Sequence, residues 1–122
     1  MKKTPKKKSE SRVSVKYKVI ELPSDNRDME KYVVSNRAEI NEKILDIIEY
    51  AVKNKLGGIE IFCFKNTSFV VVLYRKDFNE TLQDIYDFNV KQEKFEKCVR
   101  IKTLIDLVNK LGFIFKIKKS KK

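Results

Sequence analysis

Lysine side chains, whose ammonium groups neutralise phosphate, are concentrated at the two ends of this sequence. Residues 1–12 carry a net charge of +5 and residues 110–122 carry +6, whereas residues 13–109 hold 16 basic and 16 acidic residues and sum to zero. Clustered end charges favour contact with a polyanion. Each lysine–phosphate contact releases counterions, so we expect nucleic acid to be bound without sequence preference and with strong salt dependence. The candidate phosphate-binding residues are Lys2, Lys3, Lys6, Lys7, Lys8, Arg12, Lys16, Lys18, Lys116, Lys118, Lys119, Lys121 and Lys122.

A lysine-rich end can also be a solvated tail that keeps the protein soluble, or a segment attracted to an anionic membrane. Attraction to a membrane is disfavoured because the basic ends carry no tryptophan, lipidation signal or apolar helix face. The sequence also has no apolar run of 18 residues and no signal peptide. We therefore expect a soluble protein without a membrane partner, located in the cytoplasm or within a virus particle.

The sequence gives little support for catalysis. The sequence has no histidine, the commonest general base and metal ligand. Cys63 and Cys98 lack the CxxC spacing of a zinc site, and their apolar surroundings indicate buried thiols in a reducing compartment. The candidates left for holding Mg²⁺ are two acidic pairs, Asp25 with Asp28 and Asp84 with Asp87. We therefore predict a protein that is not an enzyme and uses no cofactor, metal or small-molecule substrate. A metal-dependent nuclease is the catalytic alternative.

The first half of the chain predicts a strand, a loop and a helix. Apolar and polar residues alternate from Arg12 to Leu22, which indicates a half-buried strand. The polar segment that follows, up to Lys31, is typical of a loop. A helix opens at Asn36 and ends at Gly57–Gly58, because glycine accepts the left-handed conformation at a helix C-terminus. Its apolar stripe consists of Ile40, Ile44, Ile47, Ile48, Ala51 and Val52.

The second half predicts a strand hairpin, two helices and a last strand. Two runs rich in Ile, Val and Phe within Ile59–Tyr74 flank the polar break Lys65–Ser68, which indicates two strands joined by a tight turn. Helical spacing then predicts a short helix over about residues 77–88 and a longer one over about 92–111. Phe113–Ile117 alternates again and predicts a final strand.

These elements predict an α+β fold with the order β-α-β-β-α-α-β. It is a ferredoxin-like variant in which a four-stranded, mostly antiparallel sheet carries an added helical hairpin. We expect a single domain over residues 12–117, with the helical hairpin at 78–111. Residues 1–11 would form a disordered basic arm and residues 118–122 a basic tail.

The segment Lys65–Val72 resembles the octapeptide of RNA-recognition domains at Lys65, Phe69 and Val70. The resemblance implies that aromatic rings on an exposed sheet face stack on bases. The candidate rings are Phe62, Phe64 and Phe69. The alternative is that these rings belong to the core.

A second resemblance lies in the predicted helical hairpin. Phe95, Glu96, Lys97, Ile101 and Lys102 match the second helix of the UvrB/UvrC motif, a short helical hairpin, over about residues 80–110. The resemblance implies a protein–protein contact element rather than a catalytic one. The predicted interface residues are Phe95, Glu96, Lys97, Ile101, Lys102 and Ile105. The alternative is an ordinary amphipathic hairpin packed on its own sheet.

Together these patterns favour a small, basic, non-enzymatic interaction module. Its lysine-rich ends would bind nucleic acid non-specifically while the α+β body docks on a protein partner. The alternative is a structural or assembly protein of a bacteriophage particle or another oligomer. It would use the helical hairpin and an apolar sheet face for protein–protein contacts.

Overall fold

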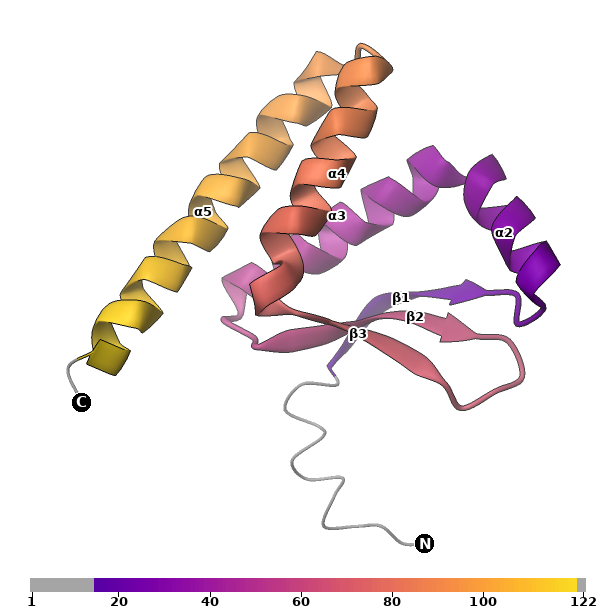
Figure 1. Ribbon diagram of the computed structural model, residues 1–122, viewed down its shortest axis with the longest axis horizontal. Helices are drawn as coiled ribbons and strands as arrows, with labels where there is room; N and C mark the ends of the chain where they lie inside the picture. Colours follow the sequence, from indigo (N-terminus) through magenta and orange to yellow (C-terminus); the bar gives the residue numbers. More distant parts are fainter. Residues whose placement is uncertain (1–14, 121–122) are drawn as a thin grey trace, which may run out of the picture. The chain divides into compact units, whose positions relative to one another are not determined.

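The computed structural model describes the backbone of residues 15–120 and the side chains of residues 15–110. The predicted basic arm over residues 1–11 lies outside these described residues. The chain divides into two compact units, one ending at Arg75 and the other beginning at Lys76. Figure 1 shows a sheet with its helices in the first unit and a pair of helices in the second. A short 3₁₀ turn, η1 (Arg75–Asp77), lies where the two units join.

The first unit is built on a three-stranded mixed sheet. Its elements are β1 (Lys16–Leu22), α2 (Asn26–Ser35), α3 (Arg37–Lys53), β2 (Gly58–Phe64) and β3 (Val70–Tyr74). The strand order is β1-β2-β3, with β2 parallel to β1 and antiparallel to β3. The α+β class is confirmed, but the predicted four-stranded, mostly antiparallel, ferredoxin-like sheet is wrong. The helical crossover returns the chain parallel to β1, and the predicted fourth strand is helical.

The core of the first unit forms where α3 packs against β1 and β2. All six residues of the predicted apolar stripe are buried, and Leu45 joins them without any exposed surface. Ile20 and Leu22 of β1 and Ile59 and Ile61 of β2 are buried as well. Removing this apolar surface from water is the main force that holds the helix on the sheet.

The predicted loop before α3 is wrong, because residues 26–35 form helix α2. Asp25 caps the helix: its carboxylate oxygen Oδ2 accepts hydrogen bonds from the backbone N–H groups of Arg27 and Asp28, both at 3.1 Å. Carboxylates are among the preferred N-cap groups. The helix has no fully buried residue. Met29, Tyr32 and Val33 lie on one side of it at helical spacing but are only half-buried, and this short stripe is outweighed by the polar residues that predict a loop.

The end of α3 differs from the glycine cap that the sequence predicts. Lys55 takes the left-handed conformation, with φ at 54°, and neither Gly57 nor Gly58 has a positive φ. Gly58 instead lies in β2, where an added Cβ would stand 3.2 Å from Cδ1 of Tyr74 and 3.3 Å from Cγ1 of Val72. The close approach of these two side chains, rather than backbone freedom, therefore favours glycine at this position.

Replacing Lys55 by glycine is expected to raise the free energy of unfolding by about 1 kcal/mol, because a left-handed conformation is strained for any residue with a Cβ. Thermal denaturation followed by circular dichroism measures the change. Lys53→Gly, in the last turn of α3, is the matched control and is expected to lower stability by about 1 kcal/mol. Equal melting temperatures for the two variants would contradict this geometry.

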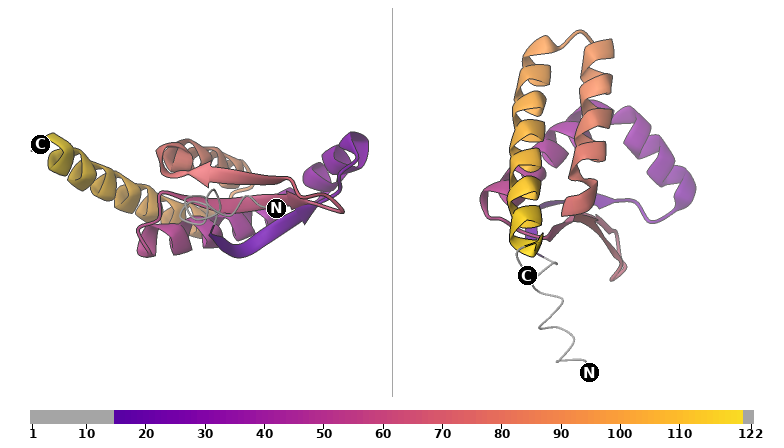
Figure 2. Two further views of the ribbon diagram at one scale, coloured as in Figure 1. Left: turned by 90° about the horizontal axis from the view of Figure 1, so that it is seen from below. Right: turned by 60° about the vertical axis from the view of Figure 1, so that its left-hand side comes forward.

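The second unit is a helical hairpin of α4 (Phe78–Lys91) and α5 (Phe95–Ser120), which pack side by side (Figure 2). Its buried apolar residues are Phe78, Leu82 and Ile85 on α4 and Cys98, Ile101, Leu104 and Val108 on α5. The Nδ2 group of Asn79, near the start of α4, donates a hydrogen bond to Oδ1 of Asn109 at 2.6 Å. Residues 110–120 therefore continue α5 past the beginning of its partner helix.

The predicted last strand, Phe113–Ile117, is wrong because these residues lie within α5. A helix that is already nucleated extends at little cost per residue, and one interior glycine opposes it by only about 1 kcal/mol. The alternating apolar residues of this segment give no helical stripe, which is why their pattern predicts a strand.

Candidate binding surfaces

The predicted phosphate-binding residues fall into three groups in the structure. Lys16 and Lys18 are exposed on β1. Lys116, Lys118 and Lys119 lie in the last turns of α5, where only the backbone is described. The remaining candidates lie outside the described residues; they are Lys2, Lys3, Lys6, Lys7, Lys8, Arg12, Lys121 and Lys122.

Lys18 is already engaged with the first unit. Its Nζ atom lies 3.5 Å from Oδ2 of Asp46 on α3 and 5.5 Å from the ring centre of Tyr17. Tyr17 in turn stacks on Tyr50, with ring centres 4.0 Å apart. An exposed ion pair of this kind contributes little, about 0–1 kcal/mol, so a phosphate could replace the carboxylate. Lys16 pairs in register with Glu60 on the neighbouring strand.

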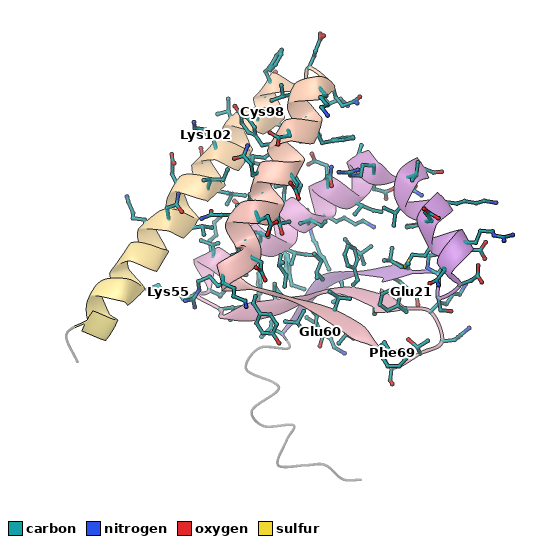
Figure 3. The ribbon with its side chains drawn as sticks, in the orientation of Figure 1. Glu21, Lys55, Glu60, Phe69, Cys98 and Lys102 are labelled. Carbon is teal, nitrogen blue, oxygen red and sulfur yellow. The ribbon has the colours of Figure 1, made fainter. Side chains whose placement is uncertain are left out.

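The sheet separates the three candidate stacking rings. Phe62 and Phe64 are half-buried and pair in register with Ile20 and Leu22, so they share the buried face of those residues. Phe69 is 72% exposed at the end of the turn before β3, and its ring points away from α3 (Figure 3). Of these three rings, only that of Phe69 is exposed.

The predicted interface residues divide by their burial in the hairpin. Ile101 is fully buried, whereas Phe95, Glu96 and Lys102 are exposed, and Lys97 and Ile105 are half-buried. Figure 3 shows Lys102 on the outer side of α5. A partner can reach the exposed members while the hairpin stays closed, but it cannot reach Ile101.

The structure adds one exposed apolar residue that the motif does not include. Val99 is 68% exposed and lies one turn along α5 from Phe95, which is 60% exposed. Residues four apart occupy the same side of a helix. A hollow of about 360 Å³, lined by residues 93–97, adjoins Phe95 at the hairpin turn. Phe95 and Val99 thus form an apolar stripe that leads away from the turn.

The acidic pairs do not assemble a metal site among the residues with described side chains. No group of three potential metal-binding side chains occurs in that part of the chain. Oδ2 of Asp25 serves as the cap of α2, and Oδ1 of Asp87 accepts a hydrogen bond from Gln83 at 3.1 Å. An open hollow of about 630 Å³ beside Asp25 and Asp28 is also lined by Lys31 and Lys65, whose cations compete with a metal ion.

Both cysteines are free thiols, Cys98 buried and Cys63 half-buried.

Of the helices between residues 15 and 120, none has the length and apolar character that a membrane span requires. No protein-family model, curated protein or solved structure matches this chain.

Proposed function

We propose that this protein is a non-enzymatic module that binds nucleic acid without sequence preference through its two lysine-rich ends. The observation that carries the proposal is the segregation of charge: the whole excess of +11 resides in residues 1–12 and 110–122, and the segment between them is neutral. A charge needed only for solubility has no reason to avoid the whole of residues 13–109. A phosphate backbone, by contrast, is held by clustered cations whatever its sequence.

The extension of α5 supports this function. Residues 110–120 carry Lys110, Lys116, Lys118 and Lys119 and no acid, and they follow Asn109, whose side chain accepts a hydrogen bond from Asn79 near the start of α4. At 1.5 Å per residue, 11 residues of helix span about 16 Å. The lysines thus lie on one continuous helix that extends beyond the start of α4, in a segment whose sequence contains no acidic residue.

Phe69 adds a second kind of contact. Its exposed ring stands next to a turn that also exposes Lys65. An aromatic ring beside a cation favours unpaired bases, because stacking contributes about 1–3 kcal/mol per base whatever the base. This pair supports binding of single strands in addition to the charge effect at the ends.

A salt titration tests the proposal. Fluorescence anisotropy of a labelled oligonucleotide of arbitrary sequence, single-stranded or duplex, gives the association constant at each salt concentration. We expect its logarithm to fall linearly with the logarithm of salt, with a slope of about −4 or steeper if five or more phosphates are contacted. A flat response, or saturable binding of one sequence only, would reject the proposal.

The second candidate is an assembly protein that docks through the hairpin. The observation that favours it is the exposed stripe of Phe95 and Val99, since side chains of this size are costly to leave in water. The two candidates differ in their response to salt: docking through an apolar stripe strengthens or persists at high salt, whereas phosphate binding weakens.

A further inference from the structure

Strand β3 forms an open edge of the sheet. In the strand order β1-β2-β3 it has a neighbour on one side only among the described strands. Its five residues, VVVLY, contain no charge, and Val70, Val71 and Tyr74 are 42%, 41% and 45% exposed. Edge strands are normally protected by lysine, proline, a bulge or a covering element, because their free backbone groups pair with other strands. Neither lysine nor proline occurs within Val70–Tyr74, and the bulge in its pairing with β2, between Glu60 and Phe62, inserts the extra residue into β2, so the backbone of β3 is continuous.

The direction of the free backbone groups follows from one hydrogen bond. The N–H of Arg75 donates to the carbonyl of Gly57 at 2.9 Å, so Arg75 faces β2. Along an antiparallel pair the direction of the backbone groups alternates with each residue. Leu73 and Val71 therefore also face β2, and the N–H and C=O groups of Val70, Val72 and Tyr74 point outward at the edge.

We propose that β3 pairs with β3 of a second copy of this chain, antiparallel, about a two-fold axis through Val72. In this register Val72 lies opposite itself and Val70 opposite Tyr74, so every outward-pointing group of the strand is used. A shift by two residues leaves one of the three residues outside the pairing. A parallel arrangement would set Arg75 and Lys76 against their own copies, and like charges directly opposite are destabilising.

The side chains of this pairing are complementary. Val70, Val72 and Tyr74 alternate onto one face of the sheet, so each copy places a valine against the tyrosine of the other. Aromatic and β-branched residues are favourable cross-strand neighbours. The two sheets become one sheet of six strands, joined by an isologous contact that closes on itself. A contact of one short strand per copy buries an area at the low end of the range for protein interfaces. We therefore expect a weak dimer that dissociates on dilution. The pairing does not depend on whether the lysine-rich ends bind nucleic acid.

Charge at the two-fold axis tests the inference. Val72→Lys brings two lysines opposite each other in the dimer. In the monomer the new lysine lies across from Glu60 on β2, an opposite charge, so we expect the fold of the monomer to be retained. Sedimentation equilibrium is expected to show a dissociation constant at least about tenfold higher for Val72→Lys than for the full-length wild type. Val72→Ile is the matched control and is expected to dimerise as the wild type does. A wild type that stays monomeric at every concentration, or equal association of Val72→Lys, would overturn the inference.

Disulfide formation tests the register itself. In a Cys63→Ser background, Val72→Cys places two thiols opposite each other, and the usual spacing of paired strands suits a disulfide. Val71→Cys is the control, because Val71 lies opposite Leu73 of the second copy. Mild oxidation is expected to give covalent dimers of Val72→Cys in much higher yield than of Val71→Cys. Equal yields from the two variants would contradict a two-fold axis at Val72.

Discussion

Glutamine replacement of the lysines at both ends is expected to weaken nucleic-acid binding by about a thousandfold at low salt. The ten positions are Lys2, Lys3, Lys6, Lys7, Lys8, Lys116, Lys118, Lys119, Lys121 and Lys122. The physical reason is counterion release: each lysine that no longer contacts a phosphate removes a contribution to both affinity and salt slope. Fluorescence anisotropy at a fixed low salt concentration measures the loss, and a titration measures the slope.

A matched set of lysines from the body separates location from total charge. Lys31, Lys55, Lys76, Lys91 and Lys94 are all exposed. Replacing these five by glutamine lowers the net charge from +11 to +6, as does replacing only the five lysines at positions 116–122. We expect the terminal set to weaken binding at least about tenfold more than the body set. Equal losses would mean that net charge alone governs binding, contrary to the proposal.

Leu45→Ala is expected to lower the free energy of unfolding by about 3 kcal/mol, because truncating a fully buried leucine removes its apolar transfer free energy and leaves a cavity, at a cost of about 2–5 kcal/mol. Leu45 has no exposed surface, and α3, on which it lies, packs against β1 and β2. Urea denaturation followed by circular dichroism in the full-length protein measures the change.

Val34→Ala on α2 is the control for this measurement. Val34 is 72% exposed, so its truncation is expected to change stability by less than about 0.5 kcal/mol. If Leu45→Ala were as mild as Val34→Ala, α3 could not be held on the sheet by the face described above.

The elements that the sequence predicts well are those with a buried stripe. The six apolar residues of α3 repeat at helical spacing and are all buried, and the hairpin of β2 and β3 follows from two apolar runs around a polar turn. Helix α2 carries a weaker signal, because its one short apolar group, Met29, Tyr32 and Val33, is only half-buried and lies within a polar segment. The sheet order depends on whether β2 runs parallel or antiparallel to β1 after the two helices that connect them. The local sequence pattern does not determine that direction.

Of the candidate sites, some could be predicted from the sequence and others could not. Charge segregation is a property of composition along the chain, so the lysine-rich ends could be identified directly from the sequence. The exposure of Phe69 could not, since its neighbours Phe62 and Phe64 have the same residue type and lie on the buried face of the sheet. The open edge at Val72 depends on strand order and on one backbone hydrogen bond, neither of which has a sequence signature.

The central claim is that nucleic acid is held at the two ends of the chain. Mass spectrometry of the protein after photochemical cross-linking to an arbitrary oligonucleotide locates the contacts by residue. The account predicts cross-linked peptides from residues 1–12 and 110–122, with Phe69 as the site expected within the body. Cross-links confined to residues 23–60, or spread evenly along the chain, would contradict it.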